Sequence, residues 1–204
     1  MIRRRHLLNF AVVTATLTLS LTAFAKPSAT NPRVVMKFEK VGEVTIELYA
    51  KDAPKTVEHF LELARKGFYN GILFHRYVEN FVVQGGDPKS KKVKGSDIRN
   101  LPSEEVGNKF HLGDGGSGKL VPLEAKATHE RGTMGLARSQ DPGSGDSQFF
   151  FNLKDNHNLD SGYCSFGKIV KGLDVMDKLR QGDKIVSIKS VGASKTKPGK
   201  KKKK

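Results

Sequence analysis

The strongest structural pattern in the chain is the stretch Phe74-His75-Arg76-Tyr77-Val78-Glu79-Asn80-Phe81-Val82-Val83-Gln84-Gly85-Gly86-Asp87. Two runs rich in apolar residues flank a turn at Glu79-Asn80, which is typical of a β-hairpin. The second run ends in two glycines, which allow another part of the chain to approach closely. We therefore predict a hairpin that carries an arginine on one strand and a glutamine on the other.

The length of the hairpin loop determines which side chains share a face, because successive residues of a strand point to opposite sides. A two-residue turn at Glu79-Asn80 would pair Arg76 with Val83. A three-residue loop, residues 79–81, would pair Arg76 with Gln84, and asparagine tolerates the left-handed conformation that such loops need. We predict the second arrangement.

The rest of the chain predicts a mainly β domain. Short apolar or alternating runs predict further strands at residues 34–38, 44–48, 132–138, 147–152, 165–170 and 185–191. Asp52-Ala53-Pro54 begins a helix that Gly67 ends, and a second short helix spans Leu173 to Leu179. In Phe149-Phe150-Phe151, alternation requires at least one ring to point away from the others.

Residues 88–120 are rich in Gly, Lys and Ser, have no sustained periodicity and predict a long loop. Gly113-Asp114-Gly115-Gly116-Ser117-Gly118-Lys119 within it has the glycine and lysine spacing of a phosphate-binding loop. The motif lacks the hydroxyl residue after its lysine, no apolar strand precedes it, and Pro122 opposes the helix that should follow. We therefore do not predict a nucleotide site.

Residues 1–25 have the pattern of a secretory signal peptide: Arg3-Arg4-Arg5, an apolar stretch from Leu7 to Leu21, and Ala23-Phe24-Ala25 as a cleavage site. An uncleaved membrane anchor is the alternative, but five hydroxyl residues dilute a short apolar core. Residues 26–33 predict a linker, residues 34–192 one folded domain, and residues 193–204 a disordered lysine-rich tail. We expect the mature protein in the periplasm.

Most of the net charge of +15 lies outside this domain. Three arginines near the N-terminus and seven lysines in the tail account for ten of these charges, which leaves +5 for residues 26–192, the linker and the domain together. This charge does not predict a surface that reads nucleic acid. The tail predicts contact with an anionic surface or, alternatively, a solubilising end without a partner.

The sequence offers no pattern for nucleophilic or metal chemistry. Ser144, His157 and Asp160 lack the G-x-S-x-G turn of a hydrolase, and His59 has no second ligand four residues on. Cys164 is the only cysteine, which excludes an intrachain disulfide, and we predict that it is a small structural residue.

The hairpin segment resembles the signature of the cyclophilins, the peptidyl-prolyl cis-trans isomerases: Phe-His-Arg, a short turn, Phe, two apolar residues and Gln-Gly-Gly-Asp. The resemblance covers about residues 34–191, apart from residues 88–120. It implies a closed antiparallel eight-stranded barrel capped by two short helices. It also implies a monomer without cofactor or metal that binds proline-containing segments of unfolded or exported proteins.

The resemblance extends to the bacterial exported type of cyclophilin through Ala137-Arg138-Ser139, and Asn158 replaces the tryptophan of eukaryotic members, which predicts weak cyclosporin binding. By the same resemblance, Arg76 and Gln84 are catalytic, and the residues that bind substrate are Phe81, Val82, Ala137, Arg138, Ser139, Gln148, Phe150, Leu159, Tyr163 and Phe166.

Elementary chemistry fits these roles. Rotation about an X-Pro bond must break amide resonance, at a barrier of roughly 20 kcal/mol, and needs neither nucleophile nor metal. A donor to the prolyl nitrogen stabilises the twisted state and not the planar one. Arg76 suits that task because it stays charged. An apolar recess would hold the proline ring, and its residues are Phe81, Val82, Phe150, Leu159 and Phe166. Gln84 and the main chain near Arg138 would hold the rest of the peptide.

A proline-binding chaperone module with weak catalysis is the alternative function, because the same groove would serve it.

Overall fold

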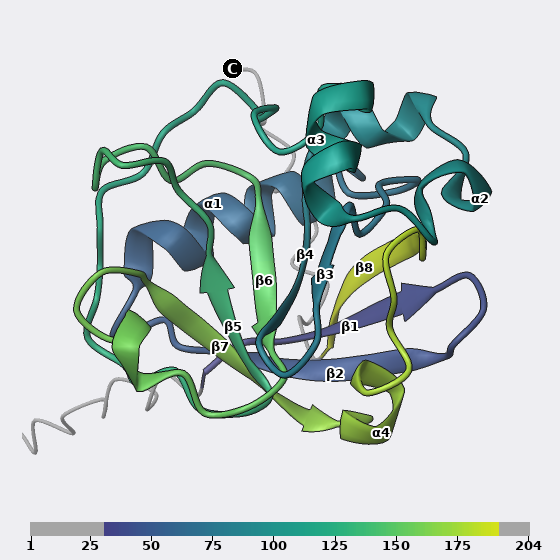
Figure 1. The fold of residues 1–204 in the computed structure, drawn as a ribbon. Helices are drawn as coiled ribbons and strands as arrows, with labels where there is room; N and C mark the ends of the chain where they lie inside the picture. The colour runs from purple at the N-terminus through teal and green to yellow at the C-terminus, as the bar shows by residue number, and fades with distance from the viewer. Residues whose placement is uncertain (1–30, 192–204) are drawn as a thin grey trace, which may run out of the picture.

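The computed structural model describes residues 31–191, and the predicted signal peptide, most of the linker and the lysine-rich tail lie outside this range. One antiparallel sheet of eight strands, in the order β3-β4-β6-β5-β7-β2-β1-β8, forms the domain (Figure 1). The strands are β1 (Arg33–Phe38), β2 (Glu43–Leu48), β3 (Arg76–Val78), β4 (Val82–Gly85), β5 (Thr133–Leu136), β6 (Phe149–Asn152), β7 (Ser165–Lys171) and β8 (Ile185–Val191). The prediction of a mainly β, eight-stranded antiparallel fold is confirmed.

The sheet curls into a half-barrel and is not the fully closed barrel that we expected. Its two edge strands, β3 and β8, do not pair with each other along their length. An isolated bridge between Leu73 and Lys184, formed by the backbone hydrogen bonds Phe74 N to Asp183 O (2.9 Å) and Ile185 N to Ile72 O (2.9 Å), joins the chain near the starts of the two strands. Two more backbone hydrogen bonds, Gly71 N to Ile185 O and Gly182 N to Phe74 O (both 2.8 Å), strengthen that junction. Short irregular segments therefore hold the edges together in place of a strand pair.

Helix α1 (Pro54–Arg65) begins at a proline and presents one apolar face, as predicted. Val57, Phe60 and Leu63 on this face are buried in the main core with strand residues from both halves of the sheet. The Glu124 carboxylate accepts hydrogen bonds from the Lys55 and Thr56 backbone N–H groups and so satisfies the first turn of the helix. Glu124, which lies 69 residues after Lys55 in the chain, thus ties the start of α1 to the body of the domain.

We predicted a long loop at residues 88–120, but the longest stretch there without helix or strand is residues 111–120. Residues 88–110 form a 3-10 helix η1 (Pro88–Lys92) and two helices, α2 (Gly95–Ile98) and α3 (Ser103–Phe110), which lie together at one end of the sheet (Figure 1). Ile98, Val106 and Leu112 pack with Leu73 in a second, smaller core. With α1 and α4 (Leu173–Met176), residues 31–191 contain four α-helices where we expected two.

The hairpin has the predicted three-residue loop. Arg76 pairs with Gln84 and Val78 with Val82, which leaves residues 79–81 as the connection. Asn80 has a φ of 53°, the left-handed conformation, and Phe81 N donates to Val78 O at 3.1 Å. Because directly opposed residues of a strand pair share a face, this register puts Arg76 and Gln84 side by side.

The predictions for the Phe149-Phe150-Phe151 run and for Cys164 agree with the structure, whereas the second predicted helix ends at Met176 and not at Leu179. Phe149 and Phe151 point into the main core, whereas Phe150 is absent from it and faces the opposite side of β6. Cys164 is free and buried, and burial raises the pKa of its thiol to about 11. No helix within residues 31–191 is long and apolar enough to span a bilayer.

Candidate functional site

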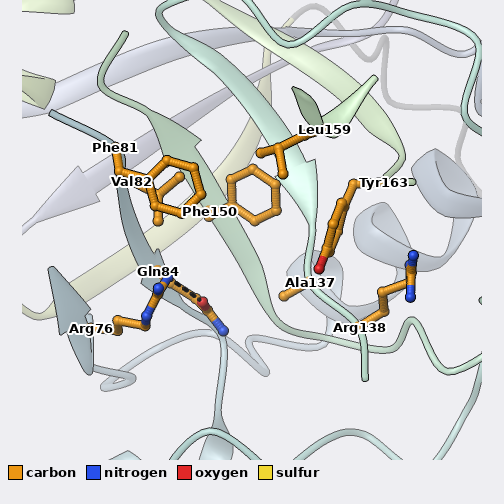
Figure 2. A pocket seen from close by; sticks show the side chains of 9 residues that line it. All are labelled: Arg76, Phe81, Val82, Gln84, Ala137, Arg138, Phe150, Leu159 and Tyr163. Carbon is orange, nitrogen blue, oxygen red and sulfur yellow. Dashed lines mark hydrogen bonds between the residues drawn. The ribbon is translucent and has the colours of Figure 1, made fainter. Parts of the chain in front are cut away.

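A surface cavity of about 250 Å³ lies where β3, β4 and β6 meet the residues that follow β5 (Figure 2). Every residue that lines it was predicted from the sequence as a site residue. The lining residues are Arg76, Phe81, Val82, Gln84, Ala137, Arg138, Phe150, Leu159 and Tyr163. The fold thus brings together residues from five separate segments of the chain.

The polar end of the cavity consists of Arg76 and Gln84 (Figure 2). Arg76 Nη1 donates to Gln84 Oε1 at 3.5 Å, and the guanidinium carbon lies 5.8 Å from the centre of the Phe81 ring. Burial lowers the pKa of Arg76, but a guanidinium still remains protonated at any working pH. The site therefore holds a permanent, partly desolvated cation beside an aromatic ring.

The apolar end is formed by Phe81, Val82, Phe150 and Leu159, with the Tyr163 ring as a side wall (Figure 2). Phe150 is only 4% exposed and lies with its edge toward Tyr163, at 6.1 Å between ring centres. Such rings offer a recess that fits a small saturated ring and has few groups with which to bind water.

The Arg138 side chain does not point into the cavity (Figure 2). Its guanidinium donates to the carbonyls of Gly162 (Nε, 2.6 Å) and Ser139 (Nη1, 2.7 Å) and lies 4.6 Å from the centre of the Tyr163 ring. Arg138 therefore holds Tyr163 in position, and its side chain is occupied by these contacts.

Ser139 and Gln148 line a second cavity of about 340 Å³, which shares Gln84, Ala137 and Arg138 with the first. Gln148 connects the two, because its Oε1 accepts from Gln84 Nε2 at 3.0 Å. The two cavities form one continuous surface along which an extended peptide could run.

Phe166 does not line either cavity, and its predicted place in the recess is wrong. Its side chain is fully buried in the main core, where it packs against Phe60 at 5.5 Å between ring centres. The first three residues of β7 are all buried, so both faces of the strand are covered there, and the sequence pattern cannot tell which face a ring occupies.

Two residues that support the recess were missed by the sequence analysis. His129 is buried and stacks on the Phe150 ring at 5.7 Å, and its Nδ1 and Nε2 contact Asn152 Nδ2 and Tyr163 O. Gly135 lies on β5 directly opposite Phe150, and a Cβ there would come within 2.3 Å of the Phe150 ring. The glycine in the predicted strand was the available signal, since a strand glycine often marks close approach of another group.

Within residues 31–191, no group of three or more His, Cys, Asp or Glu side chains is arranged to hold a metal ion.

Comparison with known proteins agrees with this geometry. Residues 33–198 match the family model of the cyclophilin type peptidyl-prolyl cis-trans isomerases. The chain is 39% identical over 169 residues to a protein of Brucella suis named a probable peptidyl-prolyl cis-trans isomerase, covering 80% of each chain. It is 35% identical over 199 residues to peptidyl-prolyl cis-trans isomerase A of Dickeya dadantii, covering 93% of this chain and 90% of the other.

The fold resembles that of a solved cyclophilin from Cryptosporidium parvum, with a TM-score of 0.62 and 24% identity over 77% of this chain and 97% of the other. The signature residues, the cavity and the relatives all lead to one conclusion: the chain belongs to the cyclophilin family and is a peptidyl-prolyl cis-trans isomerase.

Proposed function

We propose that the enzyme isomerises X-Pro bonds through a hydrogen bond that Arg76 donates to the prolyl nitrogen in the twisted state. The observation that carries this proposal is the guanidinium of Arg76 at the rim of an apolar recess. When the amide twists, its nitrogen lone pair is released from resonance and becomes an acceptor. A donor that meets the lone pair only then stabilises the transition state selectively.

The recess would hold the proline ring while one side of the bond turns. Phe81, Phe150 and Leu159 enclose the ring, and Gln84 and the main chain at residues 137–138 hold the flanking peptide. The Cryptosporidium parvum structure was determined in the presence of the dipeptide Ala-Pro, which is the kind of ligand that such a recess fits. A rate gain of about 10⁵ requires only about 7 kcal/mol, which a charged hydrogen bond, desolvation and orientation together can supply.

We further propose that the substrates are proline-containing segments of exported proteins, in the periplasm. The signal-like pattern of residues 1–25 supports this location. The lysines of the tail would add attraction to anionic surfaces. A module that binds proline peptides with weak catalysis would need the recess but not the cation, so the placement of Arg76 favours the enzyme with full turnover.

The pH dependence of turnover tests the proposed electrostatic role. We expect kcat/KM for a proline tetrapeptide to stay constant within about twofold from about pH 6.5 to 9, because Arg76 does not titrate there. Burial lowers the pKa values of His75 and His129, which favours the neutral form of both rings over this range. An NMR exchange assay, which needs no coupled protease, measures the rate. A sigmoidal or bell-shaped profile within this range would show that a titrating acid or base performs the reaction instead.

A further inference from the structure

Asp87 is a fully buried carboxylate that follows β4 and accepts hydrogen bonds from three backbone N–H groups. Its Oδ2 accepts from Gly113 N at 2.7 Å and from Gly115 N at 3.1 Å, and its Oδ1 accepts from Lys89 N at 2.8 Å. Charged acceptors form the stronger hydrogen bonds of proteins. Asp87 therefore ties the glycine-rich segment 113–118 to the end of the hairpin strand.

The glycines of this segment allow two carboxylates of the protein itself, those of Asp87 and Asp146, to approach its backbone, and they do not serve to bind a phosphate. A Cβ on Gly115 would lie 2.1 Å from Asp87 Oδ1, and a Cβ on Gly116 would lie 2.3 Å from Asp146 Oδ2. These positions can hold nothing larger than glycine while the carboxylates stay where they are. The phosphate-loop spacing in the sequence thus has a structural explanation within the protein itself.

The glycine-rich segment in turn provides the last acceptor of a chain of hydrogen bonds that begins at Arg76 and passes through two glutamine side chains. Gln148 Nε2 donates to Gly115 O at 2.8 Å, Gln84 Nε2 donates to Gln148 Oε1 at 3.0 Å, and Arg76 Nη1 donates to Gln84 Oε1 at 3.5 Å. Every bond in the chain runs in the same direction, from guanidinium to amide to amide to backbone carbonyl.

We propose that Asp87 is a positioning residue for catalysis, which aims the Arg76 guanidinium by fixing the Gly115 carbonyl at the far end of the Gln84–Gln148 chain. This inference rests on the proposed role of Arg76 and extends it to a group that does not touch the substrate.

The mechanism depends on the two-sided chemistry of an amide. A glutamine side chain can present either its oxygen or its NH₂ group to a neighbour, and only its surroundings determine which. Gly115 O accepts the Gln148 NH₂ group, so Gln148 Oε1 faces Gln84, and Gln84 Oε1 is left to face Arg76. If Gly115 moved, Gln148 could flip and present a donor to Gln84, and Arg76 would lose the acceptor that orients it.

The same segment has a second anchor, which provides a matched control. Asp146 accepts from the Ser117 hydroxyl and from Gly118 N (2.8 Å), and His59 Nε2 lies 3.4 Å from its Oδ1. This anchor holds the segment on the far side of Gly115, and within residues 31–191 Asp146 forms no hydrogen bond with Arg76, Gln84, Gln148 or Gly115. Loss of either anchor would loosen the segment, but only loss of Asp87 would release Gly113 and Gly115.

The experiment compares Asp87→Asn with Asp146→Asn in the full chain. An asparagine in place of Asp87 has one acceptor oxygen in place of two and carries no charge, so it holds the backbone N–H groups of Gly113 and Gly115 less firmly than the carboxylate does. We expect kcat, measured by NMR exchange at saturating proline peptide, to fall about tenfold in Asp87→Asn with KM changed less than about threefold. We expect Asp146→Asn to keep kcat within about twofold, although both variants have a lower Tm. Equal effects of the two variants on kcat, or a wild-type kcat in Asp87→Asn, would overturn the proposal.

A double-mutant cycle with Gln148→Leu tests whether Asp87 acts through the amide chain. If it does, Asp87→Asn adds almost nothing in the Gln148→Leu background, whereas independent effects would multiply and contradict the proposal. Should Asp87→Asn fail to fold, Gln148→Leu alone tests the chain, because an unchanged kcat would exclude it. Arg76→Ala separates the two proposals. If this variant keeps full turnover, the proposed function fails. If it loses turnover while Asp87→Asn keeps a normal kcat, only the positioning role of Asp87 is rejected.

Discussion

Replacement of Arg76 by alanine is expected to lower kcat/KM for proline peptides by about 10²–10³ and to leave peptide affinity within about threefold of the wild type. A preorganised donor in a partly desolvated site contributes about 3–4 kcal/mol to the transition state, which gives this factor. Affinity changes little because the ground-state amide nitrogen is planar and accepts no hydrogen bond. Exchange rates and peptide titrations by NMR separate the two quantities.

Two controls accompany this variant. Arg65→Ala removes an exposed arginine at the end of α1 and should leave turnover unchanged. Arg76→Ala should still suppress the aggregation of an unfolded substrate protein as the wild type does, because the apolar recess remains. Turnover close to that of the wild type in Arg76→Ala would remove the arginine from the mechanism. Loss of both turnover and the suppression of aggregation would indicate that the variant damages the recess as a whole.

Stability is expected to fall steeply below about pH 6.5, by up to about 3 kcal/mol by pH 4, mainly because of His75. The ring of His75 is 4% exposed, and neither of its nitrogens has a hydrogen-bond partner among residues 31–191. Burial, opposed in part by the charge of Asp87, lowers its pKa from 6.5 to about 4. The folded state therefore resists protonation of this ring.

The direction of the effect follows from proton binding in the two states. The unfolded chain takes up a proton at His75 near pH 6.5, whereas the folded protein does so only near pH 4. Between these values the unfolded state binds more protons, so acidification favours unfolding, and the loss due to this group levels off below pH 4.

The measurement is the free energy of unfolding by denaturant across this pH range. His75→Leu removes the titrating group and should give a shallower profile. Part of the slope remains in the variant, because burial also lowers the pKa of His129. Parallel profiles for His75→Leu and the wild type would show that other groups cause the acid sensitivity.

The sequence was sufficient for features that depend on local chemistry. The register of the β3–β4 hairpin followed from one residue, Asn80, which tolerates the left-handed conformation. Alternation along a strand predicted that at least one ring of Phe149-Phe150-Phe151 points away from the others, and the resemblance to the cyclophilins indicated that this ring is Phe150. Helix α1 followed from Pro54, one apolar face and Gly67.

Features that depend on distant partners could not be predicted in this way. Helices α2 and α3 are too short to show a reliable period, and they are stabilised by the packing of Ile98 and Val106 against Leu73 from another part of the chain. Phe166 lies on a strand that is buried on both faces at that point. The connection from Asp87 through Gly115 to Gln148 joins three segments, and no spacing within the sequence reveals it.

The basicity of the prolyl nitrogen provides the most direct test of the central claim, that Arg76 donates to this nitrogen in the twisted state. Peptides in which 4-fluoroproline replaces proline have a less basic nitrogen, and the two fluorine epimers control for ring pucker. With each peptide, NMR exchange gives the ratio of the catalysed to the uncatalysed rate. We expect this ratio to fall with both epimers in the wild type and to stay constant in Arg76→Ala, because only the wild type has the donor. A wild-type ratio that does not depend on the basicity of the nitrogen would contradict the account.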